Sequence, residues 1–348
     1  MPSQPTLPMF SAGRHLLSVS QFDRDGLELL FDMADVVAPI AERRSVCTVL
    51  DGAVLGSLFF EPSTRTRLSF ESAFLRLGGE VTTTTGFTFS SMAKGESIQD
   101  TSRVVSGYSD VLVVRHPDEG SVAEFAAAST VPVLNAGDGA GEHPSQALLD
   151  SYTLTRELDA RGRSLDGATI AVVGDLKYGR TVHSLIKLLS VNDGITFRLF
   201  SPPSLGLPDS VAEHAHQHGN TIVECRSVLE AVAEADVVYA TRVQRERMTE
   251  ELHSQVRGNL LNRELLEQAG VAQDIIIMHP LPRDSRHDAY DLSSDVDGLP
   301  GLAIFKQTDN GLKVRMAMFL IALGCSADSV RATLKQRPWR ADIDWELG

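Results

Sequence analysis

The chain has little of what marks several classes of protein. It holds only three cysteines, Cys47, Cys225 and Cys325, which lack CxxC spacing, so neither a disulfide framework nor a thiolate metal site is indicated. No run of lysine and arginine occurs, and the net charge of -14 argues against nucleic acid as a partner. The longest apolar run, residues 316–323, is far too short to span a bilayer, and residues 1–10 contain no apolar signal-peptide core. These absences predict a cytosolic protein with buried thiols and no membrane partner.

Short apolar runs alternate with helical patterns along the chain. Buried strands are predicted at residues 53–60, 111–114, 131–134, 169–173, 195–199, 237–241 and 275–278. Helices are predicted at residues 18–37, from 63 to about 77, at 144–158 and at 312–323. This alternation is the signature of parallel sheets covered by helices, and 348 residues suffice for two domains. The predicted fold class is therefore α/β, with two domains that each contain a parallel sheet flanked by helices.

One stretch suits a phosphate. Residues 53–60 are a predicted strand, Glu61-Pro62 interrupts it, and Ser63 is a natural N-cap for the helix that follows. The hydroxyls of Ser63, Thr64 and Thr66 and the guanidinium of Arg65 would lie beside the unpaired N–H groups of the first helical turn. The helix dipole, these donors and a forked arginine all favour a dianion. The alternative is an ordinary Ser-capped helix with two solvated arginines.

Polar clusters follow six of the predicted strands. They are Ser63 to Arg67, Arg115-His116, Asn135 to Gln146, Asp175 to Arg180, Arg242 to Gln244, and His279 to Arg283. Ligands of open parallel sheets bind outside the carboxyl ends of the strands, so two such sheets placed edge to edge would face these clusters into one cleft. The cleft would hold anions, since its groups are Arg65, Arg115, Arg180, Arg242, His143, Gln146 and Gln244. No Ser/His/Asp arrangement, reactive cysteine context or metal-spaced histidine pair accompanies them.

Taken singly, each cluster has a structural explanation. His143 before Pro144 is placed to cap the long helix, and Gly174-Asp175 followed by Gly179 is a turn that lacks the spacing of a dinucleotide site. Arg242 is equally compatible with a solvated helix face. The coincidence of all six clusters with strand ends favours the binding interpretation.

Five motifs together resemble the aspartate carbamoyltransferase catalytic chains of the aspartate/ornithine carbamoyltransferase superfamily, over about residues 12–325. They are Phe60-Glu61-Pro62-Ser63-Thr64-Arg65-Thr66-Arg67, His143-Pro144-Ser145-Gln146, the Gly174 to Ser184 segment, the Arg242 to Met248 segment, and His279-Pro280-Leu281-Pro282-Arg283. Ornithine relatives share the first two motifs but typically carry His-Cys-Leu-Pro in place of His279-Pro280-Leu281-Pro282. The resemblance therefore favours the aspartate branch.

The resemblance implies attack of the aspartate amine on carbamoyl phosphate, without a cofactor, a metal or a covalent enzyme intermediate. Ser63, Thr64, Arg65 and Thr66 would hold the phosphate, while Thr66, Arg115 and His143 would polarise the carbonyl oxygen. Gln146 and the backbone carbonyls of Pro280 and Leu281 would orient the carbamoyl amide. The two carboxylates of aspartate would lie against Arg180, Arg242 and Gln244.

The resemblance also implies a homotrimer with shared active sites, because the matching serine and lysine of the family, Ser90 and Lys94 here, reach into the neighbouring subunit's site. Regulatory or other pathway subunits in a larger assembly stay an open alternative. A carbamoyl-phosphate domain is expected at residues 1–145 plus about 312–348, and an aspartate domain at about 146–311. Helices 144–158 and 312–323 would join these domains, which would close on the second substrate.

Three segments depart from the family pattern. The stretch from Asp284 to Leu292 is longer than expected and has Asp291 where a glutamate is usual, which leaves a carbamoyltransferase for another amino acid as a rival. The segment Ile304-Phe305-Lys306-Gln307 is expected to change only packing, and the tail 326–348, with Trp339 and Trp345, lies outside the resemblance. A non-catalytic homologue acting as a scaffold is the rival from another class, while a dehydrogenase would need a glycine fingerprint that is lacking.

Overall fold

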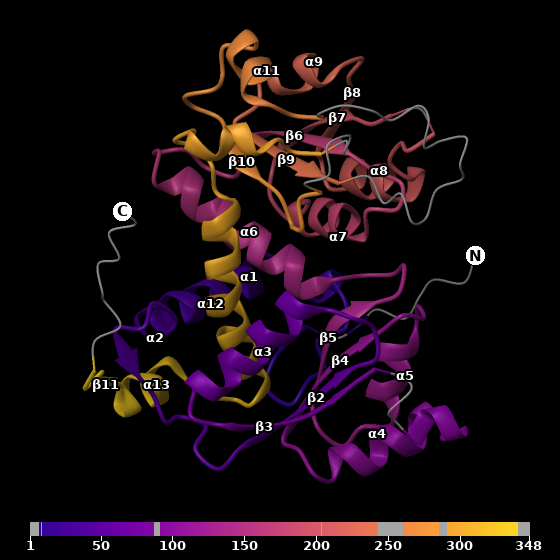
Figure 1. Cartoon of the computed structure of the whole chain (residues 1–348), viewed down its shortest axis with the longest axis vertical. Helices are drawn as coiled ribbons and strands as arrows, with labels where there is room; N and C mark the ends of the chain where they lie inside the picture. The colour runs from indigo at the N-terminus through magenta and orange to yellow at the C-terminus, as the bar shows by residue number, and fades with distance from the viewer. Residues whose placement is uncertain are drawn as a thin grey trace. The chain divides into compact units, whose positions relative to one another are not determined.

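The structure is a computed structural model that describes residue 7 and residues 9–86, 91–202, 204–242, 260–284 and 291–339. It divides into two compact units (Figure 1). The first comprises Met1–Ser145 with Gly311–Gly348, and the second comprises Gln146–Asn310. Two helices, α6 (Pro144–Asp159) and α12 (Ile304–Ala322), each contain a boundary between the units.

The sheet of the first unit is parallel, with the strand order β3-β2-β4-β5. The strands are β2 (Val54–Phe59), β3 (Glu80–Thr85), β4 (Val111–His116) and β5 (Val133–Asp138). The chain leaves β2 for β3 on one side and later returns to β4 on the other side, so the strand order reverses between β2 and β4. Such a reversal opens a crevice at the carboxyl ends of these two strands.

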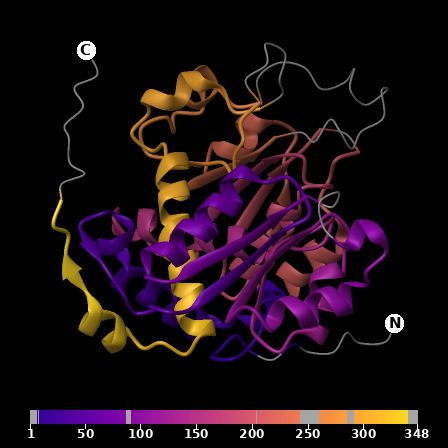
Figure 2. The same ribbon diagram turned by 60° about the horizontal axis from the view of Figure 1, so that its bottom comes forward.

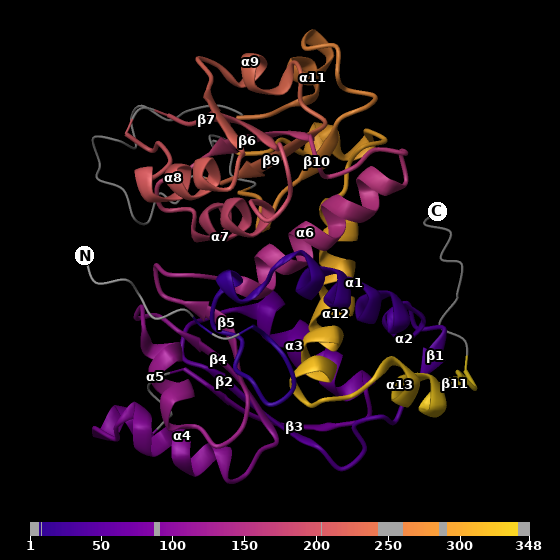
Figure 3. The same cartoon turned by 180° about the vertical axis from the view of Figure 1, so that it is seen from behind.

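Helices cover both faces of this sheet. The helix α3 (Thr64–Arg76) lies in the connection from β2 to β3, and α4 (Ile98–Ser106) lies in the connection from β3 to β4, which crosses the sheet in the opposite direction. Because parallel crossovers are right-handed, these two helices lie on opposite faces. The helices α4 and α5 (Ser121–Ala128) lie side by side in Figure 3, and their apolar side chains, Phe125 among them, join one hydrophobic cluster with β2 and β4. On α3, Phe70 and Phe74 pack edge-on against Phe319 of α12.

The second unit repeats the architecture with the strand order β10-β9-β6-β7-β8, again parallel. The strands are β6 (Thr169–Gly174), β7 (Thr196–Phe200), β8 (Thr221–Glu224), β9 (Val237–Thr241) and β10 (Ile276–Met278). Two helices, α7 (Arg180–Leu189) and α8 (Asp209–Gln217), cover one face, and α9 (Val228–Val232) and α11 (Arg263–Gln268) cover the other (Figure 1). The strand order reverses between β6 and β9.

The predicted α/β class is confirmed, and each strand expected from an apolar run is present within a few residues of its predicted bounds. Sequence reasoning missed β3 and β8, because their side chains are mostly partly or fully exposed and polar ones interrupt any apolar run. It also ended β4 and β5 too early, so that Arg115 and Asn135 lie within strands.

Two helix boundaries were predicted wrongly. In place of one helix over residues 18–37, there is a 3₁₀ turn at Val19–Gln21, followed by α1 (Arg24–Val36) and the short α2 (Ala38–Ala41). The break arises because the Asp23 carboxylate accepts a hydrogen bond from the N–H of Gly26 at 2.8 Å and starts a new helix. At the other end of the chain, α12 begins at Ile304, eight residues before the expected start at 312, since the apolar run marks only its buried second half.

The tail contains structure that the sequence did not predict. After α12 come α13 (Ala327–Thr333) and β11 (Lys335–Gln336), the yellow helix and arrow near the C-terminus in Figure 2. The strand β11 pairs antiparallel with β1 (Ser45–Val46). The guanidinium of Arg337 lies 4.8 Å from the ring centroid of Trp339, which is exposed, while Trp345 lies outside the described residues. Cys47 is buried, but Cys225 and Cys325 are only partly buried, so the expectation of three buried thiols was wrong for two of them.

Among the described residues, no single helix is long and apolar enough to cross a membrane. Length and composition would suffice only for α12 and α13 taken together, and these two helices are bent by 111° relative to each other.

Candidate active site

In the first unit, three sequence-predicted clusters lie at the carboxyl ends of adjacent strands. Ser63 to Arg67 follow β2, Arg115 is the penultimate residue of β4, and His143 follows β5. The backbone pairing of Phe59 with Arg115 fixes the first two beside the reversal of strand order. Sequence reasoning thus placed these residues at a crevice where α/β sheets bind ligands.

The first turn of α3 is open to a ligand. Ser63 is the N-cap residue, as predicted, but its side chain does not make the capping hydrogen bond that the alternative, an ordinary Ser-capped helix, would require. Beside it, a pocket of about 290 Å³ is lined by Glu61, Ser63 and Thr64 together with Gly86, which directly follows β3. Because helix N-termini present unpaired N–H groups and a partial positive charge, this turn is suited to an anion.

Arg115 is buried and held from several sides. Its Nη2 lies 2.8 Å from the carboxylate of Glu61, and its Nη1 donates to the carbonyl oxygen of Ala136 at 3.1 Å. Its guanidinium passes over Gly137, where a Cβ atom would lie 2.9 Å from Nη1. Gly137 also has a φ of 129°, which side chains disfavour, so two constraints require glycine at this position.

The geometry assigns the tautomer of His143, which is buried. Its Nε2 lies 3.4 Å from Nη1 of Arg115, and a guanidinium can only donate, so Nε2 acts as an acceptor here. The ring hydrogen then lies on Nδ1, which faces the hydroxyl oxygen of Ser145 at 3.4 Å. As a result, the Nε2 of His143 cannot donate while it accepts from Arg115, whereas the polarising role that the resemblance implies needs a ring N–H that faces the carbonyl oxygen.

Glu61 is a site residue that sequence reasoning missed. It was named in a strand-breaking pair and in the first family motif but was given no role of its own, whereas its carboxylate neutralises one side of the Arg115 guanidinium. The signal for this pairing was weak, because the two residues are far apart in sequence and meet only through the register of β2 and β4.

In the second unit, the carboxyl ends of β6, β9 and β10 are adjacent. Arg180 opens α7 after β6, and Arg242 follows β9, so both predicted aspartate-binding arginines flank the second reversal of strand order. The two strands approach so closely that a Cβ on Gly174 would lie 2.0 Å from the carbonyl oxygen of Thr241. Both arginine side chains are partly buried, which suits cations that meet a small ligand.

Side chains of the segment itself form hydrogen bonds that hold the loop between β6 and α7. The buried carboxylate of Asp175 accepts hydrogen bonds from the backbone N–H groups of Lys177 and Tyr178 at 3.2 and 2.9 Å. The Nε2 of His183 lies 2.7 Å from the carbonyl oxygen of Leu176 and donates to it. Burial lowers the pKa of His183 below its ordinary value, and the positive charge of Lys187 adds to this shift. These bonds hold the start of α7, and with it Arg180.

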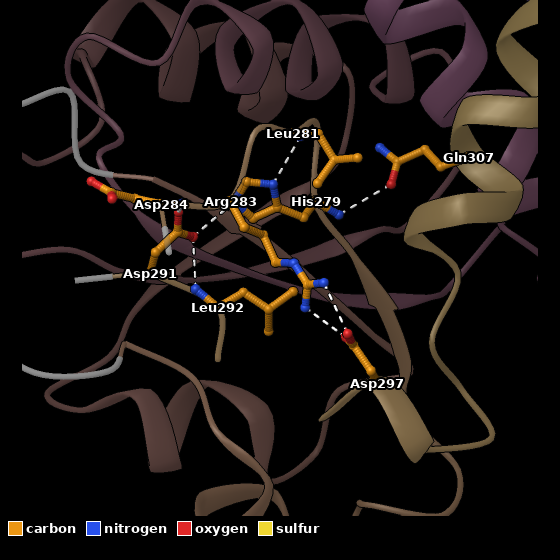
Figure 4. Close-up of polar contacts among 8 residues, drawn as sticks. All are labelled: His279, Leu281, Arg283, Asp284, Asp291, Leu292, Asp297 and Gln307. Carbon is orange, nitrogen blue, oxygen red and sulfur yellow. Dashed lines mark hydrogen bonds and ion pairs between the residues drawn. The ribbon is translucent and has the colours of Figure 1, made fainter. Parts of the chain in front are cut away.

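The turn after β10 is organised by His279 (Figure 4). Its Nδ1 accepts the N–H of Leu281 at 2.8 Å, so the ring hydrogen lies on Nε2, which donates to the carboxylate of Asp291 at 2.8 Å. Asp291 also accepts the N–H groups of Asp284 and Leu292, at 2.7 and 2.6 Å. Leu281 has a φ of 56°, a conformation that costs an L-residue roughly 1–2 kcal/mol, and its bond to the ring offsets part of that cost.

Asp291 therefore faces inward. Its side chain is 2% exposed and bonds to the turn. Arg283 forms a two-pronged ion pair with Asp297, at 2.6 and 3.0 Å. Residues 285–290, the middle of the unusual segment, lie outside the described residues.

A second buried carboxylate, Asp150 on α6, was not predicted at all. It accepts hydrogen bonds from the Nε2 of Gln146 at 2.9 Å, the hydroxyl of Tyr239 at 2.7 Å and the Nε2 of Gln307. The Oε1 of Gln307 in turn accepts the N–H of His279 at 3.1 Å. The expectation that residues 304–307 change only packing was therefore wrong for Gln307, which is a buried polar bridge.

For the remaining predicted residues, the structure gives only their position and exposure, or does not describe them. Lys94 ends a 3₁₀ turn, Ser91–Lys94, and its side chain is exposed. Arg65 is exposed at the start of α3, while Thr66 is buried. Ser90 and Gln244 lie outside the described residues. Among the residues that are described, there is no group of three or more His, Cys, Asp or Glu side chains placed to hold a metal ion.

Comparison with known proteins identifies the family of both units. The family model described as aspartate/ornithine carbamoyltransferase, carbamoyl-P binding domain, matches residues 14–156, and the Asp/Orn binding domain model matches residues 166–322. The aspartate carbamoyltransferase catalytic subunit of Dichelobacter nodosus is 52% identical over 319 residues, which cover 90% of this chain and 91% of the relative.

Similar solved structures come from the same family. The catalytic subunit of M. jannaschii aspartate transcarbamoylase is 41% identical with a TM-score of 0.77, and the match covers 88% of this chain and 96% of that one. The Trypanosoma cruzi aspartate transcarbamoylase in complex with carbamoyl phosphate and aspartate is 38% identical with a TM-score of 0.80, and the match covers 91% and 99%. The chain therefore belongs to the aspartate/ornithine carbamoyltransferase family.

Proposed function

We propose that the protein transfers the carbamoyl group of carbamoyl phosphate to the amine of L-aspartate, giving N-carbamoyl-L-aspartate and phosphate. The main support for this function is that each unit has one reversal of strand order and that groups able to bind anions lie beside each reversal. The first has a helix N-terminus and Arg115, and the second has Arg180 and Arg242. One phosphoryl dianion and one dicarboxylate are the ligands that this distribution of cations fits.

Carbamoyl phosphate is held chiefly by the first unit in this proposal. Ser63, Thr64, Arg65 and Thr66 bind the phosphate at the start of α3, and Ser90 and Lys94 contribute from a neighbouring subunit. Support comes from the Ser63 side chain, which makes no capping bond, and from the pocket beside it. The leaving phosphate carries more charge as the C–O bond breaks, so donors fixed here stabilise the transition state more than the substrate.

The carbonyl oxygen is polarised by Thr66, Arg115 and His143. In the arrangement described, Arg115 is turned towards Glu61 and His143. In this proposal, phosphate binding draws the guanidinium away from the imidazole, and the ring hydrogen then lies on Nε2 and faces the developing oxyanion. A single donor of this kind contributes about 3 kcal/mol to transition-state stabilisation.

The carbamoyl amide and the aspartate are held by the second unit. Gln146 and the carbonyls of Pro280 and Leu281 accept hydrogen bonds from the amide, while Arg180, Arg242 and Gln244 bind the two carboxylates. Support for the first set comes from the turn that His279 organises, since a fixed turn presents its carbonyls without reorganisation. Support for the second comes from the adjacency of β6 and β9.

The working unit in this proposal is a homotrimer with shared active sites, which serves de novo pyrimidine biosynthesis in the cytosol. The carbamoyl-phosphate domain is residues 1–145 with about 312–348, and the aspartate domain is about 146–311. The two compact units, Met1–Ser145 with Gly311–Gly348 and Gln146–Asn310, support this division.

Purified protein supplied with ¹³C-carbamoyl phosphate and L-aspartate should form N-carbamoyl-L-aspartate, detected by NMR, with one phosphate released for each product. Phosphate release without a carbamoylated product would show that the protein only hydrolyses carbamoyl phosphate. Absence of both would reject the proposed function and favour a scaffold.

A further inference from the structure

Asp150 lies at the centre of a buried hydrogen-bond network within the second unit. Its side chain and that of Tyr239 are fully buried, and that of Gln307 is 1% exposed. One carboxylate oxygen, Oδ1, accepts from the side-chain amides of both Gln146 and Gln307, and the other, Oδ2, accepts from the hydroxyl of Tyr239. The pKa of Tyr239 is raised well above its ordinary value, first by burial and then by the charge of Asp150, so this phenol is a donor at neutral pH.

A carboxylate that only accepts fixes the orientation of every amide that faces it. Gln146 must turn its NH₂ group towards Oδ1, so its planar amide directs the carbonyl oxygen away from Asp150. Gln307 must do the same, which places its Oε1 where it accepts the backbone N–H of His279 at 3.1 Å (Figure 4). One buried oxygen atom thus sets the direction of two amide groups that come from α6 and α12.

The orientation of each amide determines the position of a group that can accept a hydrogen bond from a ligand NH₂. The first is the Oε1 of Gln146 itself. The second is the turn after β10, whose start Gln307 holds through His279 and whose carbonyls at Pro280 and Leu281 follow immediately. The same carboxylate therefore aligns the acceptors from two separate segments of the chain.

We propose that Asp150 is the positioning residue by which the enzyme selects the amide of its carbamoyl donor, because it turns Gln146 and, through Gln307, the 279–281 turn so that both present acceptors to one NH₂ group. This inference rests on the proposed function and adds to it a residue that touches neither substrate. Without Asp150, the amide of Gln146 can flip and present NH₂ to the ligand's own NH₂, which it repels. The amide of Gln307 can flip in the same way and present NH₂ to the backbone N–H of His279, so that the turn loses the bond that holds its start.

The experiment compares carbamoyl phosphate with acetyl phosphate, in which a methyl group replaces the NH₂. With aspartate as the acceptor, kcat/KM for carbamoyl phosphate divided by kcat/KM for acetyl phosphate measures recognition of the NH₂ group. In Asp150→Leu this ratio should fall about tenfold or more, because the acceptors are no longer held in one orientation. Binding of inorganic phosphate, measured by calorimetry, should stay within about twofold of wild type, since the phosphate is bound by other residues.

Two variants separate positioning from stability. In Asp150→Asn, the amide oxygen can still accept from both glutamines, provided that the hydroxyl of Tyr239 turns to accept from the new NH₂ group. This variant should therefore keep most of the wild-type ratio. Tyr239→Phe removes a buried hydrogen bond from the same carboxylate but leaves Oδ1 in place, so it should lower the unfolding temperature while the ratio stays within about threefold of wild type.

Gln307→Met tests the same link if Asp150→Leu does not fold. It breaks the path to His279, keeps the bond between Gln146 and Asp150, and should lower the ratio by a smaller factor. An unchanged ratio in folded Asp150→Leu or Gln307→Met, or an equal loss in Tyr239→Phe, would overturn the inference while leaving the proposed function intact. An inactive wild-type enzyme would reject the proposed function instead.

Discussion

His279 donates from Nε2 to the carboxylate of Asp291, with 2.8 Å between the two atoms, and both side chains are almost completely buried. The bond fixes the ring tautomer, and the other ring nitrogen then accepts the N–H of Leu281. The stability of this part of the second unit and the shape of its turn therefore depend on one carboxylate.

Replacement of Asp291 by alanine leaves a buried ring N–H and two backbone N–H groups without their acceptor. The free energy of unfolding should fall by roughly 3 kcal/mol, since each unsatisfied buried donor costs about 1–3 kcal/mol and solvent entering the space offsets part of this. Denaturant unfolding of the purified variant measures the change. Asp297→Asn, which removes the charge of the exposed partner in the ion pair with Arg283, is the control and should cost less than about 1 kcal/mol. Equal losses in both variants would contradict the assigned role of Asp291.

Arg65→Ala removes a forked cation from the first turn of α3. The value of kcat/KM for carbamoyl phosphate should fall by roughly 10²- to 10³-fold, because the phosphate loses a donor that strengthens as charge develops. Steady-state kinetics at saturating aspartate give this value. Arg24→Ala, which removes an arginine from the first turn of α1, is the control and should leave it near wild type. Normal turnover in Arg65→Ala would remove this residue from the phosphate site.

Arg242→Ala should chiefly raise the KM for aspartate, by roughly 10- to 100-fold, because one carboxylate loses its bidentate partner. The affinity for inorganic phosphate should not change. Arg263→Ala, which loses only an exposed pairing with Glu267, is the matched control. If the dependence on aspartate is the same in both variants, Arg242 does not bind the acceptor.

The stability of the second unit should decrease in acid through His183. Burial lowers the pKa of His183 in the folded protein below its ordinary value of 6.5. The unfolded chain therefore binds the proton more readily, and stability present above pH 6.5 is lost as the pH falls towards the lowered folded-state value. Thermal unfolding between pH 8 and pH 5 should show this loss, and His183→Gln, which keeps a donor for Leu176 but does not titrate, should reduce it. An identical pH dependence in the variant would contradict the assignment.

Shared active sites make a separate prediction. Lys94→Ala and Arg65→Ala chains should each be nearly inactive alone, yet trimers formed by mixing them contain some sites with neither substitution. Activity should therefore reappear after the two proteins are denatured, mixed and refolded together, and should be absent when each is refolded alone. No recovery in mixtures that form hybrid trimers would show that each site is built within a single chain.

Sequence reasoning found the residues at strand ends but not the contacts that hold them. Arg115 and Arg242 could be predicted because apolar runs define the strands that they follow or end. The ion pair between Glu61 and Arg115 depends on strand register, and the bridge from Asp150 through Gln307 joins residues 157 positions apart. The one local signal was the spacing of Gln146 and Asp150, four residues apart on a predicted helix.

The most direct measurement is a comparison of amine acceptors. The purified enzyme should be supplied with carbamoyl phosphate and, separately, aspartate, ornithine and a small set of other amino acids, while phosphate and the carbamoylated product are followed together. The account predicts rapid turnover with aspartate and none with ornithine, because Arg180 and Arg242 require two carboxylates. Turnover with another amine but not with aspartate would contradict it and would direct attention to the segment from Asp284 to Leu292.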